Sequence, residues 1–240
     1  MGCHYMQTVS LSLYRFDTLA ARVWAFAMMG AARFALPKVP GIEFWKLCGS
    51  GTDEGFTPIP NTGVYAILCT WADLQTAQSA LQSARVFRRY EHMATENWTV
   101  FLTPITARGQ WAKTAPFRVQ TDPETGPIAA LTRATVKPLV AIRFWQQVPN
   151  IQAVIGADPN VMFKIGIGED PLFHQVTFSI WPDAQSMAHF ARSDGPHARA
   201  IRSVRDGNWF REELYARFRV AAEQGSWDGV SPRILKEQAA

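Results

Sequence analysis

The chain has 240 residues, 48% of them hydrophobic, which is enough for one large or two small packed domains. A net charge of +4 and an isoelectric point near 9.1 are mildly basic, but no block of Lys and Arg is interleaved with aromatic residues, so we exclude a nucleic-acid groove. The three cysteines, Cys3, Cys48 and Cys69, form no CxxC pair. They predict a reducing, cytoplasmic setting without a disulfide framework or a zinc site.

The first predicted elements are a strand, "TVSLSLYRF", and an apolar helix from Val23 to Leu36. This helix is too short for a bilayer, which needs about 20 apolar residues, and Arg33 interrupts it. Acidic Asp17 lies just ahead of it, which argues against a signal peptide. Because the helix is apolar nearly all round, two interpretations remain: packing against another subunit of a homo-oligomer, or peripheral contact with a membrane or lipid-like substrate.

The chain then repeats itself. Matching positions are Trp71 with Trp181, Asp73 with Asp183, Asn97-Trp98 with Asn208-Trp209, and Lys46 in "FWKLCGSG" with Lys164 in "MFKIGIGE". Each aspartate follows a strand-closing tryptophan and is expected to cap the next helix. Both halves are predicted to run strand, helix, strand, strand, helix, strand, which is the order of the ferredoxin-like β-α-β-β-α-β unit.

Two such sheets commonly close face to face, so we predict an α+β fold in which two ferredoxin-like repeats of one chain form a dimeric α+β-barrel-type structure. The predicted boundaries are 6–105 for the first repeat and 139–224 for the second. Residues 106–138, rich in Pro, Thr and Gly, are expected to be a linker, and 225–240 a tail.

The stretch "HFARSDGPHARAIRSVRDGNWF" predicts a helix beginning at Pro196, because proline is favoured at the first helical position. His197 heads its apolar stripe, whereas the neighbouring arginines lie on the other side. Counted sixteen residues from Trp71 and Trp181, Phe87 and His197 are equivalent. An apolar residue in one half and an imidazole in the other indicates a ligand in the second half, although an inward histidine can also be a hydrogen-bonded core residue.

Most cofactor signatures are absent from the sequence. It has no CxxCH, HExxH, HxxxH box, spaced Cys/His set, His-x-Asp/Glu start, dinucleotide fingerprint, Walker motif or GxSxG elbow. Non-covalent haem held by one histidine remains. We predict His197 as the axial ligand, with His174 in "HQVTFSIW" as the rival ligand or a residue lining the same cavity. Arg143 in "VAIRFW" and Lys164, both expected on strands, are the candidate partners of the propionates.

Four segments, "QTVSLSLYRF", "GIEFWKLCGSGTDEGFTPIPNTGVYAILCTW", "ENWTVFLTPI" and "HFARSDGPHARAIRSVRDGNWF", resemble the spheroidene monooxygenase family of carotenoid biosynthesis. The resemblance runs from about Met6 to about Val220 and so covers both repeats. It implies a monooxygenase with non-covalent haem b that oxidises C-2 of acyclic carotenoids, taking spheroidene through the 2-hydroxy compound to spheroidenone. Its implied partners are O2 and a ferredoxin-type electron donor.

The resemblance supplies no axial ligand, so the assignment of His197 rests on the reasoning above. Two rival functions stay open. One is a non-catalytic haem- or carotenoid-binding α+β-barrel protein, and the other is haem degradation or peroxide chemistry on the same barrel. The expected location is cytoplasmic, with membrane association as the alternative.

Overall fold

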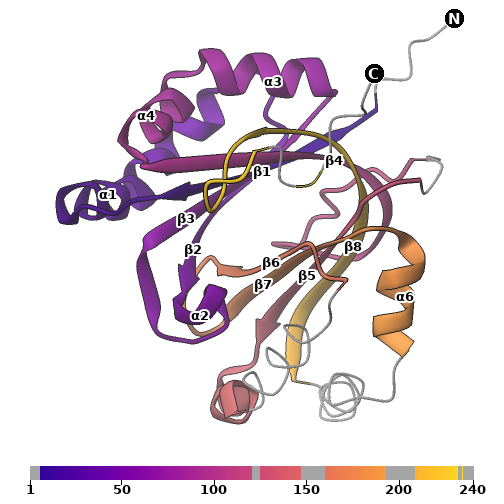
Figure 1. Ribbon diagram of the computed structural model, residues 1–240. Coiled ribbons are helices and arrows are strands. Elements are labelled where there is room, and N and C mark those ends of the chain that lie inside the picture. Colours follow the sequence, from indigo (N-terminus) through magenta and orange to yellow (C-terminus); the bar gives the residue numbers. More distant parts are fainter. Residues whose placement is uncertain (1–5, 121–124, 147–159, 193–208, 232–233, 235–240) are drawn as a thin grey trace, which may run out of the picture.

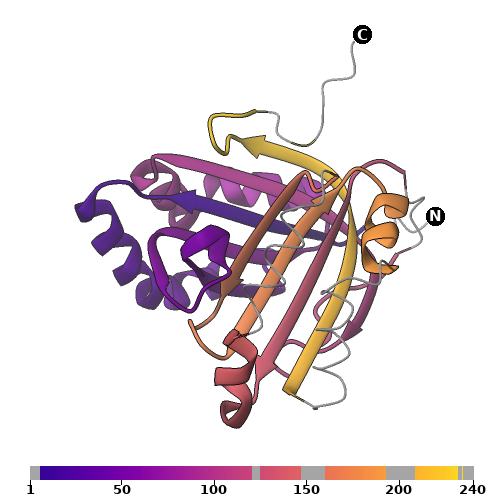
Figure 2. The ribbon, with the colours of Figure 1, turned by 60° about the horizontal axis from the view of Figure 1, so that its bottom comes forward.

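Eight antiparallel strands close into a barrel, and the helices lie outside it (Figures 1 and 2). The computed structural model describes residues 6–120, 125–146, 160–192, 209–231 and 234. Around the barrel the strand order is β1-β3-β2-β6-β7-β5-β8-β4. The prediction of an α+β fold built on a barrel is therefore confirmed.

The first half contributes four strands and most of the helices. Its elements are β1 (Thr8–Arg15), α1 (Leu19–Ala35), η1 (Leu36–Lys38), β2 (Phe44–Gly51), α2 (Thr52–Gly55), β3 (Pro60–Trp71), α3 (Leu74–Ser83), α4 (Arg85–Met93) and β4 (Glu96–Gly109). As predicted, Asp73 caps α3 by accepting a hydrogen bond from the Thr76 amide at 2.7 Å.

The second half repeats this order around the other side of the barrel. Its elements are β5 (Ile128–Val136), η2 (Pro138–Val140), a helical stretch at 141–146, β6 (Phe163–Gly168), β7 (His174–Trp181), α6 (Ala184–Arg192) and β8 (Phe210–Gly225). Strands β4-β1-β3-β2 and β8-β5-β7-β6 occupy matching places. Asp183 accepts a hydrogen bond from the Ser186 amide at 2.7 Å, which confirms the second predicted cap.

Alternation along each strand sorts side chains between the barrel interior and its outer face. In β1, Val9, Leu11 and Leu13 point inward and join one buried cluster, whereas Tyr14 joins a second cluster beneath the helices. The interior also takes in Trp111, Trp227 and Ile234, all nearly or fully buried. The barrel is therefore a packed core.

Two predicted boundaries differ from the structure. Residues 106–138 are not a linker: β4 extends to Gly109, and β5 lies within this stretch as a central barrel strand. The described part of 225–240 is not a free tail, because Trp227 and Ile234 pack in the barrel interior. Small residues dominate β5, so its composition resembled a connection.

The predicted match of Lys46 with Lys164 is off by one residue. Lys46 lies opposite Leu68, three residues before Trp71. The residue opposite Phe178, three before Trp181, is Ile165. A slip of one residue exchanges the two faces of a strand. Lys46 therefore points into the barrel, and Lys164 points away from it, as the equivalent of Trp45.

The two seams between the halves differ in length. Strands β4 and β8 pair from Trp98↔Gly225 to Gly109↔Leu214, whereas β2 and β6 pair only at Gly49↔Gly168 and Ser50↔Ile167.

Candidate functional site

The outer face of the first sheet is packed with bulky side chains. Helices α1, α3 and α4 cover it in both ribbon views and bury a continuous apolar cluster against it. The outward residues of this sheet include Tyr14, Trp45, Leu47, Tyr65, Ile67, Cys69 and Phe101. This face is a second hydrophobic core.

The second sheet lacks that set of side chains. By register, the equivalent outward positions are, in the same order, Ala134, Lys164, Gly166, Gln175, Thr177, Ser179 and Arg217. Each is smaller or more polar than its counterpart. Within the described part of the chain, α6 covers only one end of this face, where Met187 and Phe190 pack against Trp181 and Ile128. The second sheet cannot pack against helices in the way the first does.

His197 lies outside the described residues, but its counterpart Phe87 is placed. Phe87 is 1% exposed, and its ring centroid lies 6.1 Å from that of Trp71. It belongs to the cluster between the first sheet and its helices. In the first half, this position therefore faces the outer side of the sheet.

The other three predicted site residues do not meet at one point. His174 opens β7, is partly exposed, and its Nδ1 contacts the Asp170 carboxylate. Arg143 is exposed and lies in the helical stretch 141–146, so the expectation of a strand there is wrong. The Nζ of Lys164 lies 2.6 Å from Oε2 of Glu54 in α2.

Asp170 is held by its own turn. Its Oδ1 accepts hydrogen bonds from the amides of Leu172 at 2.9 Å and Phe173 at 2.6 Å. Burial acts to raise the pKa of Asp170, but these hydrogen bonds and His174 outweigh it and the pKa is lowered. The Asp170 carboxylate therefore orients the His174 ring.

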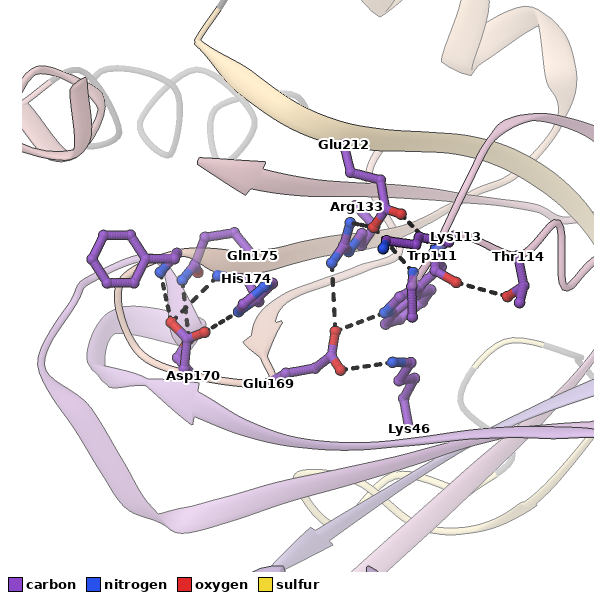
Figure 3. A network of polar contacts seen from close by, with 12 residues as sticks. Lys46, Trp111, Lys113, Thr114, Arg133, Glu169, Asp170, His174, Gln175 and Glu212 are labelled. Atoms are coloured by element: carbon purple, nitrogen blue, oxygen red, sulfur yellow. Dashed lines mark hydrogen bonds and ion pairs between the residues drawn. The ribbon is translucent and has the colours of Figure 1, made fainter. Parts of the chain in front are cut away.

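A partly buried ionic network, which sequence reasoning missed, joins the two halves inside the barrel (Figure 3). Glu169 accepts hydrogen bonds from Lys46 Nζ at 2.8 Å and Trp111 Nε1 at 2.7 Å, and Arg133 Nη2 lies 3.7 Å away. Arg133, 2% exposed, also pairs with Glu212. Burial acts to raise the pKa of Glu169, but the hydrogen bonds and the charges of Lys46 and Arg133 lower it overall.

This network had a sequence signal that depended on strand register. Arg133 follows Ala129 and Leu131 at alternate positions of β5, so it points inward. A charged residue on an inward face requires a buried partner. The composition of 106–138, rich in Pro, Thr and Gly, instead predicts a linker, and a linker has no inward face.

An apolar groove of about 290 Å³ lies between α1 and the short seam of β2 and β6. Phe26 and Met29 of α1 line one side, and Ile167 and Pro171 line another. Gln175, an outward residue of β7, lies at its border, so the groove adjoins the outer face of the second sheet. Its volume approaches that of ordinary ligand pockets, which begin near about 300 Å³.

Gly49 forms part of the groove wall. A Cβ atom at this position would meet no heavy atom within 4 Å. The groove therefore has room beside β2, and a larger side chain there would enter it. Among the described residues, no group of three or more His, Cys, Asp or Glu side chains is placed to hold a metal ion.

Sequence relatives assign the chain to a family, although no protein-family model matches it. It is 48% identical to spheroidene monooxygenase of Cereibacter sphaeroides, covering 95% of this chain and 71% of the relative. It is 46% identical to spheroidene monooxygenase of Rhodobacter capsulatus, covering 98% and 100%.

Solved structures share the fold. An aldoxime dehydratase in complex with butyraldoxime aligns with a TM-score of 0.63 over 91% of this chain and 81% of that chain, at 10% identity. A second aldoxime dehydratase structure aligns with a TM-score of 0.59, at 11% identity, over 91% and 83% of the two chains. At such identities the likeness concerns the fold alone. The sequence relatives are far closer, and by them the chain belongs to the spheroidene monooxygenase family.

Proposed function

We propose that this protein is a haem-dependent monooxygenase that oxidises C-2 of acyclic carotenoids, converting spheroidene through its 2-hydroxy compound to spheroidenone. Family membership supports the reaction. The single structural observation that supports the cofactor is the replacement of the apolar outward residues of β2 and β3 by small or polar residues at the equivalent positions of β6 and β7. We further infer that each half is a ferredoxin-like repeat, and that O2 and a reduced ferredoxin are the co-substrates.

The outer face of the second sheet fits a flat macrocycle. Gly166, Thr177 and Ser179 form a floor of small side chains, where the first sheet has Leu47, Ile67 and Cys69. The ring of haem b is large and apolar, and its propionates require cations nearby. Arg217 and Lys164 lie on this face. Since Lys164 already pairs with Glu54, Arg217 is the stronger candidate, and Arg143 remains a weaker one.

His197 is the proposed axial ligand. The argument rests on its equivalence with Phe87, which faces the outer side of its own sheet. An imidazole in that position would point at the floor of small residues. His174 is less suited, because its Nδ1 is bound to Asp170 and it starts on the inward side of β7.

The chain's own residues would position the substrate. Phe26, Met29 and Ile167 would hold one part of the polyene in the groove and exclude water from it. Gln175, at the border of groove and sheet, would guide the end of the polyene toward the second outer face. When bound, haem supplies the activation of O2, and the protein supplies orientation and shielding.

Absorption spectra test the cofactor and its ligand. We expect a Soret band in the purified protein that shifts when carbon monoxide is added to the reduced form. His197→Ala should remove or displace this band, whereas His174→Ala should keep it. His189→Ala is the matched control, because His189 is exposed on α6. A colourless wild type that stays inactive with added haem, or an unchanged His197→Ala spectrum, contradicts the proposal.

Turnover separates the oxygenase from the rival functions. With reduced ferredoxin, its reductase and spheroidene, the enzyme should form the 2-keto product only when O2 is present. A binding protein would form none. Haem degradation would instead bleach the Soret band under reducing conditions.

Gly49→Leu tests the groove. Because the added side chain would enter it, we expect kcat/KM for spheroidene to fall about tenfold or more, with the Soret band unchanged. Gly30→Leu, assayed in detergent, is the control, since Gly30 has open space and lies outside the groove lining. Equal activity of the two variants would show that the groove does not hold the substrate.

A further inference from the structure

We infer that the outer face of α1 docks on an anionic membrane surface, with the helix lying parallel to the bilayer. The first observation is an exposed apolar stripe. Leu19, Val23, Phe26 and Phe34 are 62–78% exposed, and they follow one another at helical spacing along one side of α1. Exposed apolar side chains in such a row are typical of an interfacial helix.

The opposite face of α1 fixes its orientation. Ala21, Ala25, Met28 and Ala32 are buried in the cluster over the first sheet. Arg22 Nε donates a hydrogen bond to the Phe16 carbonyl at 2.9 Å. By length and composition, Leu19–Lys38 is apolar enough to cross a membrane. Spanning would break these contacts, whereas lying flat keeps them and buries the stripe.

The position of α1 allows flat contact. In both ribbon views it lies at the periphery of the molecule, with no described element on its outer side (Figures 1 and 2). A planar surface would therefore reach the stripe without displacing another segment of the described chain.

Cations beside the stripe identify the kind of surface. Arg33 and Lys38 lie at the C-terminal end of the helical stretch, and Arg89 lies 6.0 Å from the Trp24 ring of α1. A hollow of about 680 Å³ between α1 and α4 is lined by Trp24, Ser83, Arg85, Arg88, Arg89, His92 and Met93. In the sequence of α1 and α4 and their immediate flanks, the acidic residues are Asp17 and Glu91. This surplus of positive charge complements anionic lipid headgroups.

A second copy of the chain fits this face less well. A two-fold contact places the same patch on both partners, so the cations around each stripe would face one another. An anionic membrane instead pairs with them. Charge thus favours lipid over a homodimer at α1.

The groove gives the docking a functional consequence, which rests on the proposed function. Phe26 belongs to the stripe and also lines the groove. Docking would therefore place the groove mouth against the bilayer, where an apolar polyene dissolves. The docking itself does not depend on the reaction.

Vesicle flotation tests the inference with the full chain. Wild type should float with phosphatidylcholine vesicles that contain phosphatidylglycerol, bind pure phosphatidylcholine vesicles much less, and be released by high salt. Val23→Gln with Phe26→Gln should weaken binding about tenfold or more, as should Arg88→Glu with Arg89→Glu. Leu139→Gln with Ile142→Gln is the control, because these side chains are 99% and 75% exposed in the second half.

All variants change exposed residues, so their melting temperatures should match that of wild type. Wild type that does not bind anionic vesicles overturns the inference. A second outcome also overturns it: light scattering shows a dimer, the Val23→Gln and Phe26→Gln changes dissociate that dimer, and vesicle binding is absent. The outer face of α1 would then be an interface between two copies of the chain. The Soret band and detergent activity are measured separately, so failure of docking is distinguishable from failure of the oxygenase.

Discussion

The two halves of the barrel share a strand order but use their outer faces differently. In the first half, Tyr65, Ile67 and Phe101 pack under three helices. In the second, the equivalent residues are Gln175, Thr177 and Arg217. Apart from the ionic network, the inward faces of both halves are apolar and form one core. The interior therefore closes the fold, and the outer faces are free to diverge: the first packs against helices, and the second is the face where we propose that the cofactor binds.

Phe87→Ala should have the largest effect on this comparison. It removes a buried ring from the first half, and we expect the free energy of unfolding to fall by about 3–5 kcal/mol. Urea denaturation measures this change. Haem occupancy of the folded protein should stay the same. A loss under about 1 kcal/mol would mean that the first outer face is not a packed core.

Glu169→Gln should have the second largest effect, because it removes the central carboxylate of the ionic network that joins the two halves. Lys46 and Arg133 would lose their shared carboxylate inside the barrel, which should cost about 3 kcal/mol in unfolding free energy. Glu91→Gln, at an exposed position of α4, is the control and should have almost no effect. Equal stability of the two variants would refute the role of the network.

Thr177→Phe makes the second face resemble the first. Overfilling the proposed haem site should cost about 1–3 kcal/mol of binding, or about 5- to 150-fold in haem affinity, measured by titration of the Soret band. The reciprocal change, Ile67→Thr, should instead lower unfolding stability by about 2 kcal/mol and leave haem affinity unchanged. If haem affinity changes in Ile67→Thr and not in Thr177→Phe, the cofactor binds in the first half and the proposed site is wrong.

Acidification should have the smallest effect on stability. It should destabilise the second half and the ionic network that joins the two halves. The pKa values of Glu169, Asp170 and Glu212 are lowered in the folded protein, because hydrogen bonds and nearby cations outweigh their burial. Their stabilisation is therefore present above the ordinary carboxyl pKa and is lost as pH falls through the folded values. Melting temperatures from about pH 6 to about pH 3 should decline, and less steeply in Glu169→Gln. A flat profile would contradict this.

The sequence predicted the barrel because its evidence is local. Three signals can be recognised in the sequence without knowledge of tertiary contacts: strand alternation, the capping residues Asp73 and Asp183, and the repeated tryptophans. The strand assigned to "VAIRFW" failed because a short apolar run does not separate helix from strand.

The candidate site was less accessible from sequence because it depends on register. Lys46 and Lys164 occur in similar apolar contexts, yet one faces the core and the other the outer face. Only the paired strands show that the second outer face carries small or polar residues on β6 and β7. The contrast between Phe87 and His197 was visible in the repeat, and the structure places Phe87 beside its sheet.

Because β2 and β6 form so few backbone pairs, side-chain contacts hold the barrel closed at this seam. The contacts there are two ion pairs, Lys46 with Glu169 and Lys164 with Glu54, and a hydrogen bond from the Ser50 hydroxyl to the Gly166 carbonyl. Amide protons near Gly49 should then exchange with solvent sooner than those along β4 and β8. Gly49 and Gly168 also line the groove. Each transient opening of the β2–β6 seam would therefore widen the groove and make room for a long, rigid ligand.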